Sequence, residues 1–266
     1  MKLGGNGLAL VALARYTSAT GDKAHVPLMR RLAAWIGAVQ RADGSFISHK
    51  QSYPGAVIDA GFRSSYYPGE AMLGLVRLYE HDRQAQWLDV AERAASYLIT
   101  VRDRGKEIDD LPHDHWLLMA LNDLHRLRPQ AVYPTHTWRL ARAITASQVT
   151  KTDVPDWVGG YSLPPRTTPG ATRSEGLVAA FHLLSDHGTP EQKRLLPAIR
   201  AALDRGIRCQ LRFQLRAETA MYFPSPTQAL GGFRGGTTSF DIRIDFVQHN
   251  LSSILGYRRI LLADAP

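Results

Sequence analysis

The feature that most constrains this chain is a helical hydrophobic period that recurs along nearly its whole length. Apolar residues return every three to four positions, and the two-residue alternation of a half-buried strand is nearly absent. This pattern predicts an all-α protein built from helical hairpins. Helices are expected over residues 8–16, 26–40, 69–80, 84–101, 113–127, 137–148, 173–186, 190–213 and 246–262.

The connections between these segments alternate in length. Turns within hairpins are short, as at 81–83 and 187–188. Connections between hairpins are long and should converge at one end of the array, because short antiparallel turns place them there; they span 41–65, 102–112, 150–171 and 215–244. Long ordered loops on a rigid scaffold usually carry function, and the helix N-termini that follow them favour anionic ligands.

Several helix boundaries have recognisable capping residues. Thr189-Pro190-Glu191-Gln192 combines a capping residue, a proline at the first helical position and a glutamine at the third. The segment 172–175, Thr-Arg-Ser-Glu, is interpreted as a second capping box. Asp110 is expected to cap the helix that begins near Pro112.

Composition narrows the possible classes of protein. With 266 residues, 44% apolar content and no linker-like stretch, we expect one domain over 1–266. The net charge of +8 favours an anionic partner, but the basic residues are scattered, so nucleic acid is not expected. The single cysteine excludes a disulfide framework and a multi-cysteine zinc site, and we expect neither a metal nor another cofactor. No apolar run approaches 18 residues, so no transmembrane segment is expected, while localisation and oligomeric state stay open.

The segment from Arg31 to Phe46, with Trp35, Gln40 and Gly44, resembles the Gln/Trp repeat of α/α toroids, in which an outer helix ends in Gln and a Gly-aromatic turn follows. Weaker copies occur where Gln148 precedes Gly-Gly-Tyr at 159–161, and where Gln210 or Gln214 precedes Gly-Gly-Phe at 231–233. The resemblance is to six-hairpin glycosidases with related sugar epimerases and lyases, and to terpenoid cyclases and prenyltransferases. It implies an α/α toroid of about five to six hairpins. The abrupt start at 3–7 suggests that the toroid is incomplete at the N-terminus.

Two corners where a long loop enters a helix carry most of the candidate chemistry. The first, at 63–70, combines Arg63 and Tyr67, which suit sugar binding, with the carboxylate of Glu70, which suits acid-base work. The second, at 109–116, is the densest ionisable cluster in the chain. Asp110 and Asp114 are candidate acid-base groups there, with His113 and Trp116 as binding residues. His113 and His115 diverge on a helix, which disfavours a shared metal ion.

Two later helix starts supply further candidate binding residues. Arg173 and Glu175 lie at one of them, and Asp245 and His249 lie at the other. Carboxylates that face each other from different helices would serve glycoside hydrolysis. Histidine with arginine and glutamate would instead serve proton abstraction and return in an epimerase.

These residues favour a carbohydrate-active enzyme that acts on an oligo- or polysaccharide, with an anionic substrate favoured by the positive charge. Hydrolysis, elimination and epimerisation all stay open. One alternative is an isoprenoid cyclase-like toroid, because Glu107-Ile108-Asp109-Asp110 resembles the acidic motif of protonating terpene cyclases. Another is a non-catalytic toroid that binds an acidic partner through its arginines.

Overall fold

The computed structural model describes residues 2–47, 49 and 61–263. Every regular element in these ranges is helical, and extended pairing there is limited to isolated β-bridges. The all-α expectation is confirmed. Within the described ranges, no helix combines the length and apolarity needed to cross a membrane.

The chain divides into two compact units, Met1–Thr137 and Trp138–Pro266. The division falls within α6 (Val132–Ala146). The interpretation of the chain as one domain stays a prediction.

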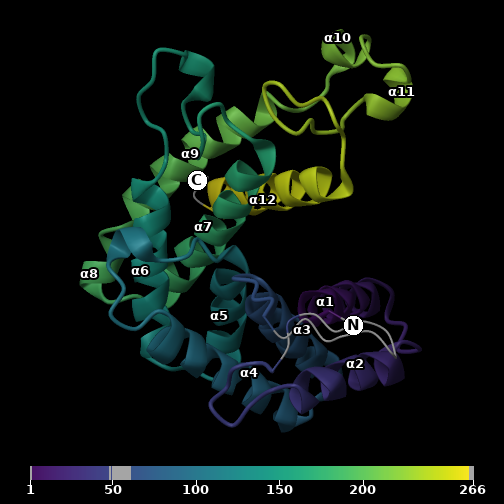
Figure 1. Ribbon diagram of the computed structural model, residues 1–266, viewed down its shortest axis with the longest axis vertical. Coiled ribbons are helices and arrows are strands. Elements are labelled where there is room, and N and C mark those ends of the chain that lie inside the picture. Colours follow the sequence, from purple (N-terminus) through teal and green to yellow (C-terminus); the bar gives the residue numbers. More distant parts are fainter. Residues whose placement is uncertain (1, 48, 50–60, 264–266) are drawn as a thin grey trace. The chain divides into compact units, whose positions relative to one another are not determined.

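The first unit is organised around α3 (Tyr67–Asp82). This helix packs against α1 (Leu3–Thr20), α2 (Val26–Ala38), α4 (Ala85–Tyr97) and α5 (His115–Leu127) (Figure 1). Every residue of α3 from Pro68 to Val76 is buried, as expected for a helix covered on all sides. A π-helical turn, η1 (Leu98–Arg102), extends α4, and the 3-10 turn η2 (Ile108–Asp110) lies in the loop before α5.

The second unit is organised around α7 (Thr167–His187), which packs against α9 (Leu196–Leu211) and α12 (Ile244–Ala263). A 3-10 turn, η3 (Pro155–Trp157), lies in the loop before α7, and α8 (Pro190–Lys193) precedes α9. Two further short helices, α10 (Ala217–Ala220) and α11 (Pro226–Ala229), lie within the long connection from α9 to α12 (Figure 1).

The structure corrects three expected boundaries. The capping box at 172–175 is wrong, because α7 already begins at Thr167 and the Thr172 hydroxyl donates within the helix to the Thr168 carbonyl at 2.9 Å. Asp110 does not cap α5; that role belongs to Asp114, which accepts from the Leu117 N–H at 3.0 Å. The expected helix over 190–213 is divided into α8 and α9, while the capping box at 189–192 is confirmed.

The glutamine-glycine segments noted in the sequence form matching turns, which we call Gln–Gly turns. In the first, Gln40 Nε2 donates to the carbonyls of Gly44 at 3.2 Å and Val90 at 2.9 Å, and Arg93 Nε donates to Gln40 Oε1 at 3.0 Å. The turn therefore joins the end of α2 to the middle of α4.

The second Gln–Gly turn repeats this arrangement in the second unit. Gln148 Nε2 donates to the carbonyls of Gly159 at 3.2 Å and Ala202 at 2.9 Å. Arg205 Nε donates to Gln148 Oε1 at 3.0 Å. Each of these turns uses one glutamine to satisfy two carbonyls and to accept from one arginine.

The third Gln–Gly turn is formed by Gln214, because Gln214 pairs with Phe233 in an antiparallel bridge as Gln40 pairs with Phe46. Gln210, the other sequence candidate, instead lies buried between Ser174 and Ser253. The structure thus decides between the two glutamines that the sequence left open.

Candidate functional site

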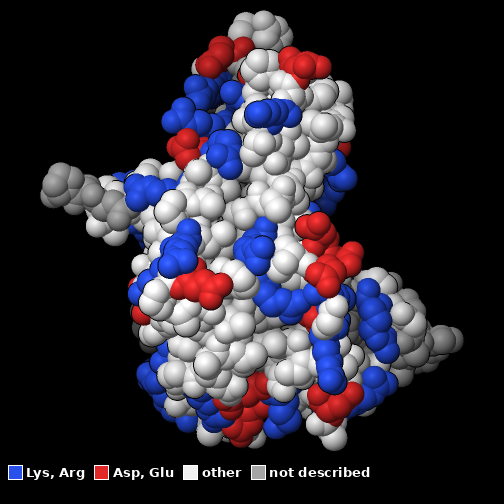
Figure 2. Space-filling view, turned by 90° about the vertical axis from the view of Figure 1, so that its left-hand side faces the viewer, with Lys and Arg blue, Asp and Glu red and all other residues white. Residues whose placement is uncertain are grey.

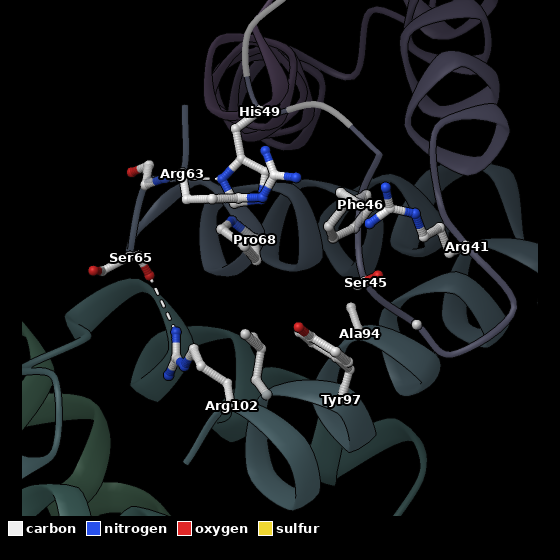
Figure 3. A pocket seen from close by; sticks show the side chains of 13 residues that line it. Arg41, Ser45, Phe46, His49, Arg63, Ser65, Pro68, Ala94, Tyr97 and Arg102 are labelled. Atoms are coloured by element: carbon white, nitrogen blue, oxygen red, sulfur yellow. Dashed lines mark hydrogen bonds between the residues drawn. The ribbon is translucent and has the colours of Figure 1, made fainter. Parts of the chain in front are cut away.

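A cavity of about 270 Å³ opens beside the first Gln–Gly turn (Figure 3). It lies between the residues of that turn, the loop that enters α3, and the end of α4 with η1. Its volume is slightly below the roughly 300–1,000 Å³ typical of drug-sized pockets, so it suits a small ligand or one unit of a chain. The lining residues are Arg41, Gly44, Ser45, Phe46, His49, Arg63, Ser64, Ser65, Pro68, Ala94, Tyr97, Leu98 and Arg102.

His49 is held in one orientation at the wall of the cavity. Its side chain is buried, and its Nδ1 accepts from the Ser64 N–H at 2.9 Å. Burial, together with the nearby charge of Arg63, lowers the pKa of His49 to about 4. The imidazole is therefore neutral at pH 7, and because Nδ1 accepts, Nε2 carries the proton and acts as a donor.

Arg102 lies on the opposite wall and links several parts of the first unit (Figure 3). It donates to the Ser65 carbonyl at 3.2 Å, to Asp114 at 2.9 Å and, through two nitrogens, to Asp103 at 2.7 and 2.9 Å. Burial opposes its charge, but the carboxylates of Asp114 and Asp103 raise the pKa of Arg102. Its charge is thus balanced locally, and Arg41 and Arg63 are the other arginines of the lining.

Of the residues predicted for the first corner, Arg63 lines the cavity and Tyr67 lies close to it. The Tyr67 ring lies 6.4 Å from His49 and 5.8 Å from Phe62, between ring centroids. Glu70 lies elsewhere, buried on α3. A Cβ added to Gly4 would come within 1.8 Å of Glu70 Oε2, so this carboxylate packs closely against α1.

The predicted residues of the second corner are separated by burial. Asp110 is exposed on η2, whereas Asp114 is fully buried and caps α5. Burial raises the pKa of Asp114, against the opposing effect of Arg102. His113 is half-buried, and Trp116 is buried where α5 passes closely over Gly69 of α3.

In the second unit, the structure brings two predicted residues together. His249 Nδ1 lies 2.6 Å from Glu175 Oε2, and both side chains are buried between α7 and α12. Arg173 lies over the ring of Tyr161 at 5.3 Å. Asp245 is separate from this pair, because it accepts from Arg243 at 2.9 and 3.0 Å.

Sequence reasoning missed four of the residues that define the cavity, namely Arg41, His49, Tyr97 and Arg102. His49 and Arg41 lie in the long 41–65 connection, whose length alone indicated function. Tyr97 is the last residue of the amphipathic helix α4 and Arg102 is the last residue of η1, and no local signal distinguishes them from surface residues.

No protein-family model matches this sequence, and a comparison with curated proteins found no significant match.

Proposed function

We propose that this protein is a carbohydrate-active enzyme of α/α-toroid architecture, which takes an anionic sugar unit of an oligo- or polysaccharide into the cavity beside the first Gln–Gly turn. The observation that carries this proposal is the presence of Arg41, Arg63 and the N–H donor of His49 around one small cavity. Guanidinium groups bind carboxylates through paired, charge-assisted hydrogen bonds.

The remaining lining suits a sugar better than a compact inorganic anion. Ser45, Ser64 and Ser65 place polar groups around the cavity, and Phe46 and Tyr97 supply aromatic surface. Hydroxyl groups of a sugar need such hydrogen-bond partners, while its apolar face packs on rings. A uronate, which combines a carboxylate with a sugar ring, matches both features.

The lining favours proton abstraction over hydrolysis. Glycoside hydrolysis uses two carboxylates that flank the scissile bond, and the described residues around the cavity include none. Elimination and epimerisation both begin when a base removes the proton beside the carboxylate, and arginines stabilise the negative charge that develops. In elimination, a C=C bond forms, the glycosidic C–O bond breaks and the leaving oxygen takes a proton.

We assign the proton transfer to Tyr97, which directs its hydroxyl into the cavity (Figure 3): the phenolate form takes the proton beside the carboxylate, and the phenol so formed gives a proton to the leaving oxygen. His49 is the neighbouring donor, since its Nδ1 is engaged by Ser64 and its Nε2 carries the proton. Asp110 and Asp114 remain the alternative acid-base groups from the sequence, and the Glu175–His249 pair supplies a second one in the other unit.

The toroid is supported by the first two Gln–Gly turns, each of which joins the end of one helix to the helix of a later hairpin. An isoprenoid cyclase is the weaker alternative. Asp109 and Asp110 are exposed on a short 3-10 turn, and a cavity lined by three arginines would oppose a carbocation.

Figure 2 shows one face, on which Lys and Arg side chains are interspersed with Asp and Glu side chains. The expectation of no nucleic acid stays a prediction.

The test is a binding and turnover screen against uronate oligosaccharides and neutral oligosaccharides of the same length. Elimination is followed by the ultraviolet absorbance of the unsaturated product, and epimerisation by deuterium uptake from heavy water. We expect Arg63→Ala to weaken binding of the uronates by about tenfold or more, as for a lost charged hydrogen bond. Tyr97→Phe should abolish turnover and leave binding nearly unchanged.

The matched control is Arg104→Ala, which removes an exposed arginine outside the cavity lining. Asp110→Asn and Asp114→Asn test the alternative acid-base groups, with circular dichroism to confirm folding. Equal binding of neutral and uronate chains, or unchanged binding by Arg63→Ala, would refute the proposed site. Uronate binding without turnover of any substrate would favour the non-catalytic toroid instead.

A further inference from the structure

The third Gln–Gly turn has the backbone pattern of the first. The N–H of Leu215 donates to the Gly232 carbonyl at 2.8 Å, and the N–H of Gly231 donates to the Leu215 carbonyl at 2.7 Å. The first turn closes through the same pair of bonds at 41–45, with distances of 2.7 and 3.0 Å. The third turn therefore closes through its own backbone hydrogen bonds.

What differs is the helix that packs against the turn. A Cβ added to Gly44 or Gly159 would come within 2.1 Å of the carbonyl oxygen of Arg93 or Arg205, so each glycine permits close approach of a helix. Gly231 has the same left-handed backbone, with a φ of 83°, yet a Cβ there would meet no described atom within 4 Å. The third turn therefore has the same backbone shape, but no described helix lies against its Gly231, although Phe233 on another side of the turn packs on Phe246 of α12.

The glutamine of this turn also differs from the other two in its hydrogen bonds. Gln40 and Gln148 each donate to a carbonyl of the packed helix and accept from its arginine. Within the described ranges, the side chain of Gln214 makes no hydrogen bond. It faces a cavity of about 550 Å³ whose lining is mainly apolar and includes Leu215, Tyr222, Phe223, Pro224 and Phe240.

The same chain carries the matching helix surface on α2. Arg205 of α9 lies nine residues before Gln214, and Arg31 of α2 lies nine residues before Gln40. Arg31 is exposed and has no hydrogen bond or ion pair in the described part of the chain. Leu28 precedes it by three residues, at the position of the accepting carbonyl, and is 38% exposed.

We propose that this protein associates head to tail with a second copy of itself, the third Gln–Gly turn of one copy binding α2 of the next. Arg31 of the partner copy donates to Gln214 Oε1, and Gln214 Nε2 donates to the partner's Leu28 carbonyl. Gly231 lies against the partner's Arg31 carbonyl. These contacts repeat those that Gln40 makes with α4 and Gln148 makes with α9. Tyr222 and Phe240 line the cavity beside Gln214, and their exposed fractions are 82% and 59%. Burial of these apolar side chains would stabilise the contact.

The observations favour a second copy as the occupant. Among the described residues, the third Gln–Gly turn lacks a helix at Gly231, the Arg31 face of α2 lacks a turn, and Leu28 and Arg31 have the same spacing as the carbonyl and arginine residues of the two packed helices. The contact uses two different surfaces, so it is heterologous and generates either a closed ring or an open chain of copies. This inference does not depend on the proposed enzymatic function.

The first test is sedimentation of the wild-type protein over a range of concentrations. We expect oligomers that grow with concentration or close into one ring. Gly231→Ala should weaken association by about tenfold or more, since its Cβ would meet the partner's carbonyl. Gly21→Ala is the matched control, because Gly21 also has a positive φ, 75°, and its added Cβ meets nothing within 4 Å.

A mixing experiment tests the head-to-tail geometry directly. Arg31→Glu removes the helix surface and leaves the turn intact, whereas Gly231→Ala removes the turn surface and leaves α2 intact. At the concentrations where the wild-type protein begins to associate, each variant alone should be monomeric, and an equimolar mixture should form dimers that grow no further. Circular dichroism of each variant establishes that it is folded.

A wild-type protein that stays monomeric at all concentrations would overturn the proposal, as would a mixture that fails to form dimers. The proposal would also be wrong if Gly231→Ala and Gly21→Ala associated equally well. A disulfide between cysteines placed at 31 and 214 distinguishes contact between two copies from contact within one chain. We expect it to link two chains, and a link confined to a monomer would contradict the association.

Discussion

His136 Nε2 lies 3.2 Å from Asp103 Oδ2, and both side chains are buried. Asp103 also accepts from Arg102 and Lys106, so one carboxylate balances the charges of its neighbours beside the candidate site. Removing one member of a buried charged network leaves the others unpaired in a medium that solvates them poorly.

Asp103→Asn is therefore expected to lower the free energy of unfolding by about 3–5 kcal/mol. The measurement is urea denaturation at pH 7. Asp109→Asn, which changes an exposed aspartate on η2, is the control and should stay within about 0.5 kcal/mol of wild type. Similar unfolding of the two variants would show that the network contributes little.

The stability of the first unit should decrease as the pH falls from about 6.5 to about 4. The pKa of His49 is lowered from 6.5 to about 4 by burial and by Arg63, so in this window the unfolded chain binds a proton that the folded chain does not. The free energy of unfolding then falls with falling pH. His49→Asn should flatten the profile measured by urea denaturation, whereas His25→Asn, which changes a histidine in the α1–α2 turn, should not.

Acid should destabilise the protein further below about pH 4. Burial opposes the ionisation of Asp103, but hydrogen bonds from His136 and Arg102 hold its pKa below the usual range. A depressed carboxyl pKa contributes stability above the unfolded value, near 3.9, and that contribution is lost as the pH falls. The steep acid transition should be weaker in Asp103→Asn, and an unchanged transition would assign it to other carboxylates.

Gly44→Ala and Gly159→Ala should each cost about 3 kcal/mol or more. The new Cβ would come within 2.1 Å of a backbone carbonyl, and each glycine has a positive φ. Gly21→Ala separates the two causes, because it carries the backbone strain without the contact and should cost only about 1 kcal/mol. Equal losses in thermal denaturation would mean that the helix moves aside at no cost.

The Glu175–His249 pair should show a measurable coupling. A double-mutant cycle with Glu175→Gln and His249→Gln is expected to give an interaction energy of about 0.5–3 kcal/mol, because the two buried side chains share a hydrogen bond of 2.6 Å. The cycle is measured by denaturation of the four proteins. Additive losses would show that each residue acts through other contacts.

Much of the helical pattern was predictable because it depends on local periodicity. The expected helix over 26–40 matches α2 closely, and the cap at 189–192 has both of its hydrogen bonds. The start of α7 was missed because Pro169 and Gly170 are typical of loops. Proline is tolerated in the first turn of a helix, where its missing N–H has no partner to lose.

The site was less predictable, because burial and distance decide it. Arg63 was a candidate by position, and it lines the cavity. Asp114 was a candidate acid-base group, and it lies fully buried as a helix cap bound to Arg102. A dense ionisable cluster in sequence does not reveal which members face solvent.

The sequence by itself determined the all-α class and the glutamine and glycine residues of the first two Gln–Gly turns, because apolar spacing and turn residues are local features of short segments. Only the tertiary structure decided that Arg41, His49, Arg63 and Tyr97 share one cavity, and that Glu175 meets His249. Arg41, His49 and Arg63 share one long connection, but Tyr97 lies at the end of α4, and Glu175 and His249 lie on α7 and α12. Their distances depend on how helices pack, and side-chain packing between distant segments leaves no periodic signal in the sequence.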